Sequence, residues 1–273
     1  MTDEYLAANQ RRWNALTPLH AASNYYDLAA FKAGGSSLRA IEREQVGDVT
    51  GKSLLHLQCH FGMDTLSWAR LGARVTGVDF SGEAIALARE LSAELAIPAE
   101  FVQADVLRLP ETLPGREQFD IVFTSYGILC WLPDLRAWGR TIAHYLRPGG
   151  LFCIVEGHPL AGVFDNEADA TDLRVTHSYF HDAAPEHYEV RGSYATGEGE
   201  VLAGYEWAHS LGDIINALTG AGLNILSLQE YPFASWRRFP FMVPADAEWW
   251  RLPDGFPALP LTFSLRATKS QHP

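Results

Sequence analysis

Between residues 53 and 157 the sequence alternates short apolar stretches with longer amphipathic ones. The stretches "SLLHLQ" (53–58) and "ARVTGVDF" (73–80) predict strands, and "DTLSWARLG" (64–72) between them predicts a helix. Two strands joined by a helix form a crossover unit, which places both strands parallel in one sheet. The repeated alternation therefore predicts an α/β fold, in which helices cover both faces of a mostly parallel sheet.

Polar residues at the expected helix ends support this pattern. Ser81 is placed to cap a helix over 82–97, and Asp134 is placed to cap another that "RPGG" (147–150) ends. Further strands are predicted over 99–105, 119–127 and 151–157. The region up to residue 158 therefore supplies most of the sheet.

The flanking regions follow other patterns. Residues 4–32 predict two helices separated by a break, and 37–47 predict a further short helix. After residue 158, strands are predicted for "VTHSYF", "YEVRGSYA" and "VLAGYEWAH", and the last two form a hairpin through the linker "TGEGE" (196–200). A helix over 210–223 and two strands, 224–231 and 259–269, then close the sheet, and 232–259 is expected to be an ordered loop.

These patterns divide the chain into four segments. They are an N-terminal helical lid (1–50), a core (51–158), an antiparallel β insertion that serves as a substrate lid (159–208) and a C-terminal completion of the core sheet (209–273).

Composition and charge exclude several classes of protein. With 33 acidic and 21 basic residues the net charge is −12, which repels phosphate backbones, so we expect no nucleic-acid partner. The three cysteines form no CxxC pair, and the N-terminus does not resemble a signal peptide, so we expect a cytoplasmic protein with reduced thiols. No run of about 18 apolar residues predicts a membrane span. The histidines show no metal-ligand spacing, so we expect no metal, and we expect a monomer or a homodimer.

The stretch "LLHLQCHFGMDTL" (54–66) predicts a turn between a strand and a helix, with Gly62 as its one glycine. Free N–H groups and the helix dipole at such a turn favour a polar or anionic ligand. Asp79 and Asp105 end the next two strands, and Ser125 and Tyr126 end the fourth. Each aspartate alone could simply cap a turn. Together they fall at the carboxyl edge of the sheet, where open parallel sheets bind nucleotide-like ligands.

These motifs resemble those of class I S-adenosylmethionine (SAM)-dependent methyltransferases, in the small-molecule branch that includes methyltransferase types 11 and 12. The likeness runs from about residue 52 to 156 and again over 209–268, through "LLHLQCHFG", "VTGVDFS", "VQADVLRLP", "FDIVFTSYGILCWLPD" and "LRPGGLFCIVE". It implies a Rossmann-like sheet of seven mostly parallel strands, with 51–158 as the SAM-binding core. It also implies that Asp79 binds the ribose and that Phe80, Asp105 and Val106 lie at the adenine.

The first motif departs from the family pattern at three positions. The family usually has an acidic residue at His56 and glycine at Gln58 and His60. We infer that the Gln58 amide and the backbone around Cys59 and His60 hold the amino-acid end of SAM, with Ser125 nearby, although His60 could merely fill the turn. A nicotinamide dehydrogenase requires bare backbone for its pyrophosphate, and these side chains obstruct that arrangement.

The resemblance implies methyl transfer from SAM, with S-adenosylhomocysteine as product, to a small acceptor at N, O or C, which could be aromatic or heterocyclic. Such an enzyme aligns its acceptor and needs a base only for a hydroxyl or a protonated amine. His158 is the candidate base and Tyr126 could orient the substrate, although a structural role is open for each. His209 could cap the following helix.

Aromatic residues outside the core are the candidate substrate wall, or simply the interface between lid and core. Arg237 and Arg238 could bind a substrate carboxylate or be solvated. A SAM-using cyclase and a non-catalytic SAM-binding protein remain alternatives. The predicted substrate residues are Trp13, Tyr25, Tyr26, Tyr205 and Trp207.

Overall fold

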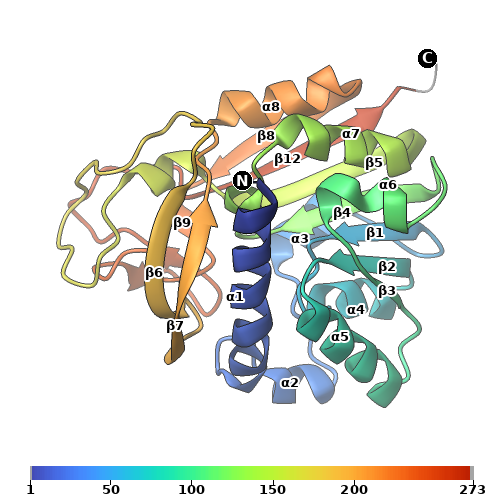
Figure 1. Cartoon of the computed structure of the whole chain (residues 1–273), viewed down its shortest axis with the longest axis horizontal. Coiled ribbons are helices and arrows are strands. Elements are labelled where there is room, and N and C mark those ends of the chain that lie inside the picture. The colour runs from blue at the N-terminus through green and yellow to red at the C-terminus, as the bar shows by residue number, and fades with distance from the viewer. Residues whose placement is uncertain (1, 271–273) are drawn as a thin grey trace.

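A computed structural model of the chain describes residues 2–270. Its main sheet has seven strands in the order β3-β2-β1-β4-β5-β12-β8 (Figure 1). Neighbouring strands from β3 to β5 are parallel, whereas β12 is antiparallel to both β5 and β8. The predicted α/β fold is therefore confirmed. The strands are β1 (Ser53–Leu57), β2 (Arg74–Asp79), β3 (Glu100–Gln103), β4 (Phe119–Ser125), β5 (Leu146–Gly157), β8 (Leu223–Tyr231) and β12 (Thr262–Lys269).

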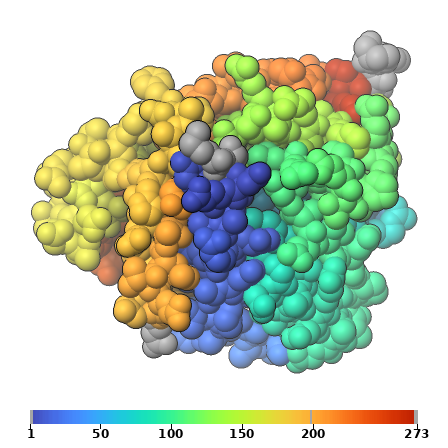
Figure 2. Space-filling view, in the orientation of Figure 1, coloured from blue at the N-terminus to red at the C-terminus, as the bar shows by residue number. Residues whose placement is uncertain are grey.

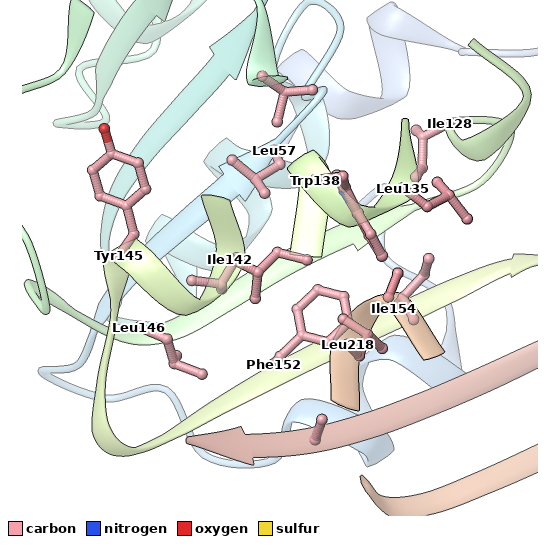
Figure 3. Close-up of a cluster of buried hydrophobic side chains, with 14 of the residues drawn as sticks. Leu57, Ile128, Leu135, Trp138, Ile142, Tyr145, Leu146, Phe152, Ile154 and Leu218 are labelled. Carbon is pink, nitrogen blue, oxygen red and sulfur yellow. The ribbon is translucent and has the colours of Figure 1, made fainter. Parts of the chain in front are cut away.

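Helices cover both faces of this sheet. Side chains alternate along β1, so that Leu54 packs towards α3 and α4, whereas Leu55 and Leu57 pack towards α7 and α8. Figure 3 shows the second of these clusters, in which Trp138 of α7 and Leu218 of α8 meet the sheet. The helices are α3 (Ala40–Val46), α4 (Met63–Arg70), α5 (Gly82–Glu94), α6 (Leu109–Thr112), α7 (Leu135–Tyr145) and α8 (Leu211–Gly220), with short 3-10 helices η1 (Val106–Arg108), η2 (Leu129–Trp131) and η3 (Pro159–Val163).

The predicted helix caps are present. Ser81 accepts a hydrogen bond from the Ala84 N–H, and Asp134 accepts from two N–H groups at the start of α7. Ser210 caps α8 in a reciprocal arrangement with Asp213. His209 was the residue considered for this role, but its Nε2 instead donates to the Leu132 carbonyl at 2.7 Å.

The N-terminal helix α1 (Thr2–Ala22) lies beside the hairpin of β6 (Glu186–Ser193) and β7 (Thr196–Glu206), whereas α2 (Leu28–Lys32) packs against α4 and α5 through Phe31. Figure 1 shows α1 between this hairpin and the core, where it contacts both β7 and α5. The hairpin was predicted, but its turn is Tyr194–Ala195, and the expected linker 196–200 belongs to β7. Two-residue turns suit the twist of paired strands, and the cross-strand register fixes which residues form the turn.

Two other expectations outside the core are corrected. The stretch 175–180 is not a strand, because only Val175 pairs, in one isolated bridge to Phe164. Val175 and Phe180 are exposed, so burial of their apolar side chains does not stabilise a strand here. Residues 232–259 are not only loop, because three short antiparallel strands pack around the buried Phe239 and Met242. These strands are β9 (Phe233–Ala234), β10 (Val243–Pro244) and β11 (Trp250–Arg251). Among the described helices, none combines the length and apolarity needed to cross a membrane.

Candidate functional site

A cavity of about 1430 Å³ lies at the carboxyl ends of β1 to β5. Its floor is made by the segments that follow these strands, around the β1–β4 boundary where the strand order reverses. Its other walls come from α1, the α1–α2 connection, the hairpin and residues 235–250. Figure 2 shows α1 filling the space between the hairpin and the core on the outer face. Every residue predicted to contact the cofactor lines this cavity: Gln58, Cys59, His60, Gly62, Asp79, Phe80, Asp105, Val106 and Ser125.

The loop after β1 keeps a backbone suited to glycine although only one glycine remains. Gln58 and His60 have φ values of 57° and 49°, in the left-handed region that costs an ordinary residue roughly 1–2 kcal/mol. Gly62 has φ 80°, and a Cβ there would lie 2.7 Å from the Phe101 ring. Gly62 is therefore required sterically, whereas Gln58 and His60 only tolerate strain. Between them, the Cys59 N–H donates to the Val78 carbonyl.

Asp79 organises this loop. One carboxylate oxygen accepts from the His60 N–H at 2.8 Å and the other accepts from the Ser81 N–H at 2.9 Å. Burial raises the pKa of Asp79 to about 6, against the opposing effect of these two hydrogen bonds. Each carboxylate oxygen can still accept another hydrogen bond, so Asp79 could bind two hydroxyls of a ligand. Asp105 in the same way caps η1 through the Leu107 N–H, and burial raises its pKa.

One end of the cavity carries a cation beside an anion. Asp64, in the first turn of α4, accepts from the Ser37 hydroxyl at 2.6 Å and from the Ser125 hydroxyl at 3.2 Å. The Arg39 guanidinium lies 5.1 Å from the centre of the Tyr126 ring and also lines the cavity. A guanidinium and a carboxylate at one end of a cavity match the carboxylate and ammonium of an amino acid.

His56 stands where the motif that this chain resembles usually has an acidic residue, and its imidazole is neutral. His56 is buried, its Nδ1 hydrogen-bonds the Thr65 hydroxyl at 2.8 Å, and burial lowers its pKa to about 4. Nearby Glu42 is fully buried, and within residues 2–270 no group hydrogen-bonds either of its carboxylate oxygens. Burial, and secondarily the charge of Asp64, raise the pKa of Glu42 to about 7. Asp64 is therefore the carboxylate that faces the cavity beside His56.

His60 connects α1 and the hairpin to the loop after β1 and does more than fill the turn. Its Nε2 lies 3.0 Å from His20 Nδ1, and His20 Nε2 lies 2.7 Å from the Ser193 hydroxyl. His20 belongs to α1 and Ser193 ends β6, so one imidazole joins helix, hairpin and loop. Burial lowers the pKa of His20 to about 4, which keeps this imidazole neutral at pH 7.

The two predicted catalytic residues line the cavity, but protein groups surround their polar atoms. His158 Nδ1 accepts from the Leu160 N–H at 3.0 Å. Its Nε2 lies 2.8 Å from Glu230 Oε1, although the angle is not that of a hydrogen bond. The Tyr126 hydroxyl is buried behind the Arg39 stack, and burial together with Glu42 raises its pKa. Catalysis by either residue stays a prediction.

Four of the five predicted substrate residues line the cavity, namely Trp13, Tyr25, Tyr26 and Trp207. Tyr205 does not, because neighbouring residues of a strand face opposite sides. Its ring packs on Tyr5 at 4.6 Å, outside the cavity, and the next residue, Glu206, lines the cavity instead. β7 ends at Glu206, so the alternation of the strand does not extend to Trp207, which lines the cavity beside Glu206.

The sequence interpretation also missed Arg39 and Asp64. Arg39 was assigned only to a helix, although it is the N-cap residue of α3. Asp64 stands two residues after Gly62, directly behind a motif that lacks its usual acid. That missing acid was the available signal, because an acidic residue nearby could replace its charge.

Comparisons with known proteins agree with this geometry. Residues 54–150 match the family described as "Methyltransferase domain". The ubiquinone biosynthesis O-methyltransferase of Proteus mirabilis is 34% identical over 108 residues, which are 40% of this chain and 43% of that protein. The match thus spans less than half the length of this relative.

Solved structures share the fold over most of the chain. A structure from Listeria monocytogenes, assigned as an SAM-dependent methyltransferase, covers 89% of this chain and 99% of its own, with 16% identity and a TM-score of 0.60. A complex of DhpI with S-adenosylhomocysteine covers 97% of both chains, with 20% identity and a TM-score of 0.56. Residues 54–150 are therefore similar to a methyltransferase domain, and the chain has the fold of these SAM-dependent methyltransferase structures.

Proposed function

We propose that the protein transfers a methyl group from SAM to a small-molecule acceptor. The observation that supports this proposal is the arrangement of one cavity around three polar regions. Asp79 and Asp105 lie at the ends of neighbouring strands, and the Arg39–Asp64 pair lies at the far side of the β1 loop. These regions match, in order, a ribose, an adenine and an amino acid, which are the three polar parts of SAM.

The proposal assigns each region a role. Asp79 would accept from the ribose hydroxyls, and Asp105, Val106 and Phe80 would hold the adenine. Asp64 would bind the ammonium and Arg39 the carboxylate. Gln58 Oε1, which has no hydrogen-bond partner within residues 2–270, would be a further acceptor. When bound, SAM supplies an activated methyl group. The protein holds the acceptor in line with that group and excludes water.

The cavity has room for the acceptor. Its volume of about 1430 Å³ exceeds the range of roughly 300–1000 Å³ typical of a single small-molecule site. We infer that segments 1–50 and 159–208 form the lid over this space, with Trp13 and Trp207 against the acceptor. We keep His158 as the candidate base and Tyr126 as the orienting residue. The acidic surface and the free cysteines favour a cytoplasmic enzyme without a nucleic-acid partner, as a monomer or homodimer.

Product analysis by mass spectrometry tests the proposal. The protein is incubated with SAM and a panel of small aromatic and heterocyclic acceptors. We expect S-adenosylhomocysteine and a methylated acceptor in equal amounts, and we expect Asp79→Ala to lower the yield of both when SAM is not saturating. Methylthioadenosine as product would instead indicate a cyclase. SAM binding without any product across the panel would indicate a non-catalytic role.

A further inference from the structure

A second charged pair lines the cavity, apart from the residues assigned to SAM. Arg238 follows β9, and its Nε donates to the Ala161 carbonyl at 2.9 Å. This is the one hydrogen bond of the Arg238 side chain with the described part of the chain, and no described carboxylate lies within 4.0 Å of its guanidinium. The group is only partly buried, because it faces the cavity. The backbone contact fixes the guanidinium while its terminal N–H groups stay available.

Two carboxylates, Glu156 and Glu206, lie near this guanidinium, but neither forms an ion pair with it. Glu156 is among its charged neighbours, but the Glu156 oxygens accept from three N–H groups, those of Gly127, Ile128 and Gly157. Glu206, at the end of β7, accepts from the Tyr188 hydroxyl at 2.7 Å through Oε1. Its Oε2 has no hydrogen bond to the described residues. Glu206 and Arg238 therefore influence each other's charge without forming an ion pair.

The other cation near Glu206, Arg12, already forms hydrogen bonds with the hairpin. The Arg12 guanidinium donates to the carbonyls of Gly192, at 2.8 Å, and Leu202, at 3.2 Å, so it holds the hairpin. Aromatic side chains complete this part of the cavity: Arg238 lies 5.9 Å from the Trp236 ring centre, and Trp131 and Tyr179 also line the wall. This region therefore combines a guanidinium without an ion-pair partner among the described residues, a carboxylate with one oxygen available to accept, and flat aromatic surfaces.

We propose that the methyl acceptor is an aromatic or heteroaromatic carboxylic acid, whose carboxylate binds Arg238 and whose ring hydroxyl or amino group donates to Glu206. The proposal rests on the proposed function, since it assigns the second occupant of the same cavity. A guanidinium pairs with a carboxylate through two parallel hydrogen bonds, and the tryptophans suit a planar ring. Arg237, the neighbouring residue, also lines the cavity, but its guanidinium is exposed, donates to the Pro240 carbonyl and lies 5.6 Å from the Trp250 ring centre, so we assign the carboxylate to Arg238.

Calorimetry on the full chain tests this assignment in two steps. S-adenosylhomocysteine is titrated first, and its heat tests the proposed function alone. Hydroxybenzoates and hydroxypyridine carboxylates are then titrated into the loaded protein, each beside its carboxamide, which keeps the shape and removes the charge. We expect at least one acid to bind about 10-fold more tightly than its amide, as a charge-assisted pair predicts.

Variants separate a binding role from a structural one. Arg238→Gln should abolish the preference for the acid and leave the affinities for the amide and for S-adenosylhomocysteine unchanged. The matched control, Arg237→Gln, should keep the preference. Glu206→Gln should reduce the advantage of a hydroxylated acid over the parent acid. The assignment fails if S-adenosylhomocysteine binds but no acid does, if acids and amides bind equally, or if Arg238→Gln keeps the preference.

Discussion

At the scale of single residues, the candidate site differs from the class I methyltransferase pattern that it resembles mainly in the positions of its charged side chains. A neutral imidazole, His56, occupies the usual acidic position, and Asp64 brings a carboxylate to the cavity from the first turn of α4. Two serine hydroxyls orient that carboxylate. A carboxylate that could bind the ammonium group of SAM is thus present in the cavity, at Asp64 instead of at position 56.

This relocation predicts a selective loss of affinity in Asp64→Asn. The amide keeps the size of the carboxylate but loses its charge, so S-adenosylhomocysteine should bind about 10-fold more weakly. 5′-Methylthioadenosine lacks the amino-acid end and should bind as it does to the wild type. Calorimetry measures both affinities, with the exposed Asp254→Asn as control. Equal losses for both ligands would show that Asp64 acts on the structure of the loop.

The ionisation of Asp79 gives a second prediction at this scale. Its pKa is about 6 in the free protein, and ribose hydroxyls donate hydrogen bonds to its ionised form. Binding should therefore be strongest above pH 6 and weaken by up to about tenfold per pH unit below it. Calorimetry from pH 5 to pH 8 measures this dependence. Asp79→Asn should bind weakly at every pH, and a similar pH profile in both proteins would contradict the assignment.

The sequence located some site residues better than others, for physical reasons. The cavity positions of Gly62, Asp79 and Asp105 could be predicted because these residues lie at, or a few residues after, the ends of predicted strands. The partners of Asp64 could not, because Ser37 and Ser125 are 27 and 61 residues away and only tertiary packing brings them together. Arg39 was missed for the same reason.

At the scale of elements, α1 joins the β6–β7 hairpin to the core sheet and its helices. Asn9 exchanges two hydrogen bonds with the backbone of Tyr205 in β7, at 2.8 and 2.9 Å. Arg12 bonds three carbonyls of the hairpin, and Gln10 donates to the Phe80 carbonyl at the edge of the site. Helix and hairpin should therefore move together over the cavity.

Removing the Arg12 side chain should loosen the hairpin. Arg12→Ala leaves the carbonyls of Val190, Leu202 and Gly192 without their charged donor. Amide hydrogen exchange in β6 and β7 should become about 10-fold faster or more, while β1 and β4 stay protected. The exposed neighbour provides the control, Arg11→Ala, which should change neither region. Unchanged exchange in the hairpin would show that it is held by other contacts.

Elements with local signals were predicted well. Ser81 and Asp134 placed the starts of α5 and α7, because a cap acts within one turn of the helix. The hairpin turn was misplaced because pairing between strands, and not local composition, sets its register. The stretch 175–180 has the alternation of a strand but no core to face, which the sequence does not reveal.

At the scale of the whole molecule, the central claim is that core and lid enclose one cavity for SAM and its acceptor. In this proposal the carboxyl edge of the sheet would supply the SAM contacts, and the later segments would supply the charged and aromatic wall opposite. The likeness of the fold to the DhpI complex covers 97% of the chain, so it includes the lid as well as the core. The domain match, by contrast, is confined to residues 54–150.

Titration of the full chain with S-adenosylhomocysteine tests this claim most directly. We predict one site per chain and a loss of affinity of at least about 10-fold, or roughly 1.4 kcal/mol, in Asp79→Ala. Asp254→Ala, an exposed aspartate outside the cavity, should bind like the wild type. Absence of binding to the wild type, or equal affinity in the wild type and Asp79→Ala, would contradict the account.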